Sequence, residues 1–182
     1  MNYTQKSGQL TIEMCDMSVV EYMNHISRMP AELENSMKER KKVLWVIGDS
    51  TLSSFNDKYY YPRYGYGTKL AAYLDDAVEV KNIALSGRSS KSYTTEPQYK
   101  ELTGGMQKGD FLLIGFGHND EKTEEARFTS AQGDYKTAGS FAASLYDNYI
   151  VPAQKAGCQV ILCTPIVRRT KTGEWNAQDL HV

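Results

Sequence analysis

The sequence has few cysteines, no long apolar run and almost no net charge. Its 182 residues include only Cys15, Cys158 and Cys163, whose spacing does not match a disulfide framework. No apolar stretch is long enough to span a membrane, and the N-terminus lacks the apolar core of a signal peptide. A net charge of −1 gives no electrostatic basis for a nucleic-acid or membrane partner. These absences predict a cytoplasmic protein, or a secreted one if a leader has been removed, and they leave its oligomeric state open.

The composition is that of an ordinary globular protein. Hydrophobic residues make up 41% of the chain and charged residues 24%, as in typical globular proteins. The length of 182 residues is enough for one domain with a substantial core. The 13 tyrosines are many for this length, and five of them lie within residues 59–66. A tyrosine pairs an apolar ring with a hydroxyl, so this cluster is either a sugar-contacting surface or a half-buried loop.

Residues 1–40 differ in pattern from the rest of the chain. Apolar residues within 18–37 have a loosely helical spacing that Pro30 interrupts, which predicts a short helix pair or another N-terminal appendage. From Lys42 onward, apolar runs alternate with helical patterns. The predicted strands are 42–47, 78–85, 110–115 and 160–163. The predicted helices are 66–74 and 135–156, with a short helix or turn at 96–102. This alternation predicts an α/β domain over 41–182, with a parallel, flavodoxin-like sheet of order 2-1-3-4.

Three of the predicted strands end in short polar loops. These are Gly48-Asp49-Ser50-Thr51, Ser86-Gly87-Arg88 and Gly117-His118-Asn119-Asp120. In the predicted strand order the three strands are neighbours, so their carboxyl-end loops converge where open α/β sheets bind ligands.

Such a cluster can support acyl transfer through a serine. Ser50 supplies the hydroxyl, and an oxyanion hole could form from the backbone N–H groups of Ser50 and Gly87 with the Asn119 amide. The alternative is that Gly-Asp-Ser after a strand is turn and helix-cap chemistry.

The three loops resemble sequence blocks I, II and III of the GDSL-type, or SGNH, hydrolases. The longer segments Gly87-Arg88-Ser89-Ser90-Lys91-Ser92-Tyr93 and Phe116-Gly117-His118-Asn119-Asp120, with Thr164-Pro165 before Arg168-Arg169, are similar to rhamnogalacturonan acetylesterases. The resemblance covers residues 42 to about 170. It implies a three-layer α/β/α sandwich that hydrolyses acetyl esters on pectic carbohydrate, with neither a metal nor an organic cofactor. Ser50 is then the nucleophile, and Gly87 and Asn119 are oxyanion donors.

The general base is where this sequence departs from the family. The family's base is a histidine in a late Asp-x-x-His box, which is absent here. His181, in Asp179-Leu180-His181, is one residue too close to its aspartate and is a weak candidate. We therefore expect the chain to stop before the family's C-terminal segment and to lack a fifth strand.

Two further residues are predicted to bind substrate, and two rival functions remain. Arg88 could contact a galacturonate carboxylate or tether its own loop, and His118 lies inside block III, where it shapes the loop. One rival is a sugar-binding relic or fragment without a base. The other is a metal phosphoesterase using Asp49, His118 and Asp120, although the Gly-His-Asn-Asp order does not match such enzymes.

Overall fold

The computed structural model describes residues 2–6, 9–13, 40–55, 59–60, 62–167 and 172–173. Its contacts divide the chain into two units, Met1–Arg40 and Lys41–Val182. In the first unit, β1 (Asn2–Lys6) pairs antiparallel with β2 (Gln9–Glu13). The helix pair expected within 18–37 lies outside the described residues.

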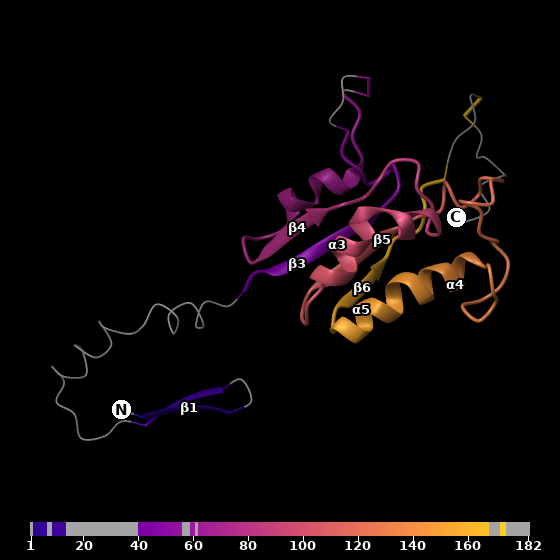
Figure 1. Ribbon diagram of the computed structural model, residues 1–182. Helices are drawn as coiled ribbons and strands as arrows, with labels where there is room; N and C mark the ends of the chain where they lie inside the picture. The colour runs from indigo at the N-terminus through magenta and orange to yellow at the C-terminus, as the bar shows by residue number, and fades with distance from the viewer. Residues whose placement is uncertain are drawn as a thin grey trace. The chain divides into compact units, whose positions relative to one another are not determined.

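The second unit is built on a four-stranded parallel sheet (Figure 1). Its strands are β3 (Lys42–Gly48), β4 (Val78–Asn82), β5 (Phe111–Gly115) and β6 (Gln159–Leu162). They pair in the order β4-β3-β5-β6. The predicted parallel sheet of order 2-1-3-4 is therefore confirmed.

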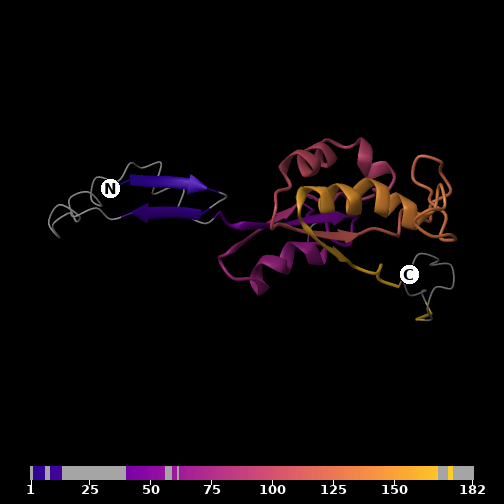
Figure 2. The same ribbon diagram turned by 90° about the horizontal axis from the view of Figure 1, so that it is seen from below.

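Helices cover both faces of this sheet, so the predicted three-layer α/β/α architecture is confirmed (Figure 2). The 3-10 helix η1 (Tyr66–Tyr73) lies on one face. The other face carries η2 (Ser92–Thr95), α3 (Pro97–Gly105), α4 (Phe141–Leu145) and α5 (Val151–Ala156). No helix in the described part of the chain is both long and apolar enough to cross a membrane.

Alternate residues of β3 pack on opposite faces of the sheet. Val43, Trp45 and Ile47 join the core beneath α3 and α5, whereas Leu44 and Val46 join the core that includes residues of η1. All five side chains are at least 93% buried. A strand buried on both faces needs a continuous apolar run, which is what the sequence shows between Lys42 and Gly48.

The long helix predicted over 135–156 starts later and is not regular. It begins at Phe141, because the Ser140 hydroxyl accepts a hydrogen bond from Ala143 N at 2.9 Å and caps it there. A π-helical turn, η3 (Tyr146–Ile150), then separates α4 from α5. Pro152 has no N–H to offer to Asn148 O, which accepts instead from the Tyr99 hydroxyl at 3.1 Å.

The predicted second strand ends three residues early, yet its chain stays beside β3. The side chain of Asn82 accepts from Ala84 N and ends the regular ladder. The N–H groups of Ile83 and Leu85 still donate to β3, at Val46 O and Gly48 O, both at 2.9 Å. The loop that follows Leu85 is therefore anchored to the same end of the sheet as the turn after β3.

Two glycines allow a close approach at the carboxyl ends of β3 and β5. Gly48 pairs in register with Gly115, and fully buried Leu52 packs against both. A Cβ on Gly115 would lie 2.3 Å from Leu52 Cδ1, and one on Gly48 would lie 2.3 Å from Gly115 O. This contact fixes the turn from Asp49 to Ser53 against the end of the sheet.

We expect Gly115→Ala to destabilise the protein by about 1–3 kcal/mol, because the added methyl overpacks this site. Leu52→Val removes the clashing Cδ1, so the double variant should lose less stability than the two single variants summed. Gly104→Ala in α3 is the matched control. A Cβ there meets nothing within 4 Å, so it should stabilise by up to about 1 kcal/mol. Urea unfolding measures all four, and strictly additive losses would contradict this packing.

Candidate active site

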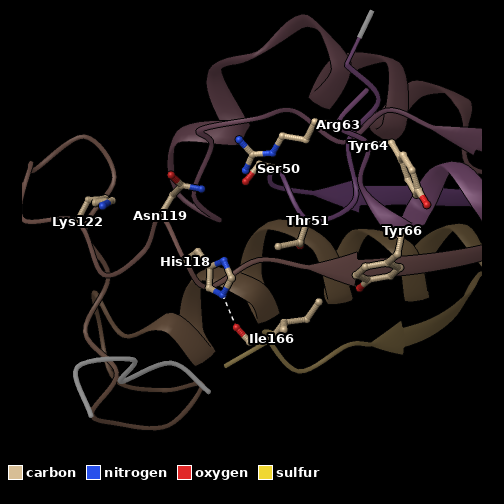
Figure 3. Close-up of a pocket in the computed structure, with 9 residues that line it drawn as sticks. All are labelled: Ser50, Thr51, Arg63, Tyr64, Tyr66, His118, Asn119, Lys122 and Ile166. Atoms are coloured by element: carbon tan, nitrogen blue, oxygen red, sulfur yellow. Dashed lines mark hydrogen bonds between the residues drawn. The ribbon is translucent and has the colours of Figure 1, made fainter. Parts of the chain in front are cut away.

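The first and third polar loops meet at the carboxyl edge of the sheet, beside a cavity of about 560 Å³ (Figure 3). Three of the predicted site residues, Ser50, His118 and Asn119, line this cavity. The other lining residues are Thr51, Arg63, Tyr64, Tyr66, Lys122 and Ile166. The topology therefore brings the first and third loops together around one space.

The turn after β3 leaves the Ser50 side chain available. Asp49 makes the side-chain hydrogen bonds of this turn: its buried Oδ1 accepts from Thr51 N at 2.9 Å and Thr51 Oγ1 at 2.8 Å. Its carbonyl oxygen also accepts from Ser53 N at 3.1 Å. Neither the hydroxyl nor the N–H of Ser50 donates to any other described residue. Turn chemistry is thus present, but Asp49 performs it, and within the described residues 51–55 no helix follows directly that Ser50 could cap.

Gly87 occupies the loop after β4 in a conformation that favours glycine. Its φ is +78°, in the left-handed region, and a Cβ there would point into open space. Within the described ranges its N–H has no hydrogen-bond acceptor. Gly87 does not line the cavity itself, and its role as an oxyanion donor stays a prediction.

Asn119 is held with its amide oxygen away from Ser50. The side chain is 92% buried, and Oδ1 accepts from Arg127 Nη1 at 3.4 Å. In the view of Figure 3 the amide nitrogen is turned toward Ser50 and the oxygen away from it. This is the orientation that an oxyanion donor needs, because only the NH2 group can stabilise negative charge.

The buried carboxylate of Asp120 ties the second loop to the third. It accepts from Ser90 N at 3.1 Å, Ser90 Oγ at 2.5 Å and Thr129 Oγ1 at 2.9 Å. Ser90 follows Gly87 by three residues, and Asp120 follows Asn119 directly. One side chain therefore sets the spacing between the two loops that carry the candidate oxyanion donors.

Tyr149 adds a second tie to the same loop. Its hydroxyl, which the π-helical turn presents, donates to Ser90 O at 2.5 Å. Burial, with smaller contributions from Tyr93, Tyr99 and Asp120, raises the pKa of Tyr149 well above its ordinary value. The hydroxyl consequently stays protonated and able to donate throughout the neutral range.

The structure places the other predicted residues differently. Arg88 is paired with Glu96 and does not line the cavity, which favours its alternative role as a loop tether. His118 lines the cavity and donates from Nε2 to Ile166 O at 2.6 Å. His181, the candidate base, lies outside the described residues.

The side chains of the metal-phosphoesterase alternative do not converge on one point. Asp49 binds Thr51, Asp120 binds Ser90 and Thr129, and His118 binds Ile166. Across the described residues, no group of three or more His, Cys, Asp or Glu side chains is placed to hold a metal ion.

Two cations that the sequence motifs did not predict, Arg63 and Lys122, also line the cavity. The Arg63 guanidinium lies over the Phe55 ring, 5.2 Å from its centroid, within the tyrosine-rich stretch already noted as a possible sugar surface. Lys122 follows block III by two residues. Neither pairs with a carboxylate in the part of the chain that is described. The sequence signal that could have identified them is that Lys122 lies close to block III and Arg63 lies among the clustered tyrosines.

Known proteins resemble this chain in both sequence and fold. No protein-family model matches it. It is 29% identical over 126 residues to Probable rhamnogalacturonan acetylesterase YesY of Bacillus subtilis, a match that covers 69% of this chain and 54% of that protein. It is 35% identical over 79 residues to the rhamnogalacturonan acetylesterase of Emericella nidulans, covering 43% and 29%. The chain is therefore similar in sequence to rhamnogalacturonan acetylesterases.

A solved structure supports the α/β fold of this chain. The YxiM protein of Bacillus subtilis matches with a TM-score of 0.59 at 24% identity, over 73% of this chain and 36% of that one. The chain spans about half of YesY, and less than half of the Emericella nidulans enzyme and of YxiM.

Buried tyrosines make stability depend on alkaline pH. Burial raises the pKa values of Tyr66, Tyr93 and Tyr149 above the ordinary value of about 10. The unfolded chain therefore ionises first, so folding free energy is lost as the pH rises above about 10.

We expect Tyr149→Phe to make this alkaline loss shallower by up to about 1.4 kcal/mol per pH unit. Urea unfolding between pH 8 and about 11.5 measures the slope. Tyr73→Phe, which removes the same hydroxyl from a ring that is 84% exposed, should keep the parent slope. An unchanged slope in Tyr149→Phe would contradict the buried neutral hydroxyl.

Proposed function

We propose that this chain hydrolyses acetyl esters on a carbohydrate, with Ser50 as the nucleophile. The Ser50 oxygen attacks the acetyl carbon, the sugar alcohol leaves with a proton, and water then releases acetate from the acyl-serine. The observation that carries the proposal is the pairing of an unengaged Ser50 hydroxyl with an Asn119 amide nitrogen at the same cavity.

The negative charge that forms on the acetyl oxygen would be stabilised by three donors. These are the backbone N–H groups of Ser50 and Gly87 and the NH2 group of Asn119. Within the described residues, none of the three donates to another acceptor. Loss of one such donor typically lowers kcat by about 10²–10³-fold. Because the loops are tied through Asp120, the donors need little rearrangement when the substrate binds.

The proton on Ser50 needs a base. His181 is the one weak candidate for this base that the sequence offers, in Asp179-Leu180-His181. A sugar-binding function is the second candidate, and one observation favours it: no described residue accepts a hydrogen bond from the Ser50 hydroxyl. A serine without a base keeps an alcohol's high pKa and would turn over slowly.

We further propose that the carbohydrate is pectic and carries uronate carboxylates. Arg63 and Lys122 supply positive charge at the cavity, and an acidic sugar would neutralise it. Tyr64 and Tyr66 offer rings and hydroxyls to the sugar. A volume of about 560 Å³ lies within the usual range for small-ligand sites. Two relatives are named rhamnogalacturonan acetylesterases.

Ser50→Ala should abolish hydrolysis of an aryl acetate and of acetylated pectin, lowering kcat by about 10³-fold or more. Ser54→Ala is the matched control, because Ser54 is exposed and does not line the Ser50 cavity. His181→Ala should cause a loss of similar size if His181 is the base. Activity that survives Ser50→Ala would overturn the esterase proposal, and binding of acetylated pectin without hydrolysis would favour the second candidate.

Arg63→Gln and Lys122→Gln should each raise KM for an acetylated galacturonan by about two- to fivefold, since each removes one exposed charge contact. The effect should shrink at high salt, and KM for neutral acetylated xylan should not change. Lys155→Gln on α5 provides the control for loss of a surface cation. Equal changes for the acidic and the neutral polymer would argue against recognition of the carboxylate.

A further inference from the structure

An asparagine can serve as an oxyanion donor only in one of its two orientations. The NH2 and the oxygen of the amide have nearly the same shape, so packing alone discriminates poorly between them. With the oxygen toward Ser50, the amide would repel the charge that it is supposed to stabilise. Something in the surroundings must therefore select the productive orientation of Asn119.

Arg127 lies on the oxygen side of this amide. Its Nη1 donates to Asn119 Oδ1 at 3.4 Å, while Nη2 donates to Glu124 Oε1 at 2.6 Å. The guanidinium thus spans the two residues, and its side chain is only 29% exposed. Because a guanidinium donates hydrogen bonds and accepts none, it can bond the amide oxygen but never the NH2 group.

The loop that carries Arg127 is itself fixed at both ends. Arg127 N donates to Glu124 O at 2.9 Å, and Thr129 N donates to Asp120 O at 3.1 Å. The Asp120 carboxylate also accepts from the Thr129 hydroxyl. Arg127 is therefore held against Asn119 by the same buried residue that ties the second loop to the third.

Lys122, the other cation near Asn119, contacts it in a different way. Its backbone N–H donates to the backbone oxygen of Asn119 at 3.2 Å, and its side chain lines the cavity. Among the described residues, only Arg127 donates a hydrogen bond to the amide oxygen itself. The side chain of Lys122 therefore faces the cavity, whereas that of Arg127 contacts the amide of Asn119.

We infer that Arg127 is a positioning residue, which holds the Asn119 oxygen and so turns the amide NH2 toward Ser50. Glu124 anchors the guanidinium in turn. The positive charge also draws electron density toward Oδ1, which makes the NH2 group a stronger donor to a developing oxyanion. The kinetic consequence rests on the proposed esterase function, but the orientation of Asn119 does not.

The kinetic test is a double-mutant cycle in the full chain. Arg127→Ala should lower kcat for an aryl acetate by about tenfold with little change in KM, because an oxyanion contact acts in the transition state. Arg127→Lys should recover part of the loss. Asn119→Ala should cost more, and adding Arg127→Ala to it should cause no further loss. Additive losses, or a change confined to KM, would overturn the inference.

A second readout does not need catalysis. Nuclear Overhauser effects from the Asn119 NH2 protons, assigned by their loss in Asn119→Asp, should reach Ser50 in the parent chain. They should weaken in Arg127→Ala, persist in Arg127→Lys and persist in the surface control Lys155→Ala. Unchanged effects in Arg127→Ala would overturn the inference. A chain that is inactive but shows the expected pattern would defeat the esterase proposal and leave the inference standing.

Discussion

The buried carboxylate of Asp120 is the constraint on which the candidate site depends. It accepts from the backbone and hydroxyl of Ser90 and from the hydroxyl of Thr129. A charge with 0% exposure is tolerated only when hydrogen bonds replace its lost hydration. Those donors come from two different loops, so the hydrogen bonds that stabilise the carboxylate also fix the distance between the loops. The candidate oxyanion donors on these loops are thereby held in place before the substrate binds, which avoids the cost of reorienting dipoles during the reaction.

The register of the sheet fixes the positions of the turns that carry the site. Gly48 and Gly115 face each other in register, which places the turns after β3 and β5 at one level. The chain after β4 remains bonded to β3 as far as Leu85. Leu52, packed against both glycines, links the position of Ser50 to the core rather than to the loop surface.

Much of this arrangement could be predicted from the sequence, and the failures have physical causes. The apolar run of β3 predicts a strand buried on both faces, and strand order brings Ser50 and Asn119 to one cavity. The predicted helix start at residue 135 was wrong because Ser140 caps α4, which begins at Phe141. Hydrophobic periodicity alone does not show where such a cap ends the helical pattern. The contacts of Arg88, Arg63 and Arg127 could not be ranked in advance, since each depends on the path of an irregular loop.

The central claim is that three loops form one oxyanion site around Ser50. A crystal structure of the chain with a phosphonate bonded covalently to the Ser50 oxygen tests it most directly, because the phosphonyl oxygen mimics the tetrahedral oxyanion. The account predicts that this oxygen lies about 2.7–3.1 Å from Ser50 N, Gly87 N and Asn119 Nδ2. An oxygen directed to solvent, or labelling of another residue in place of Ser50, would contradict it.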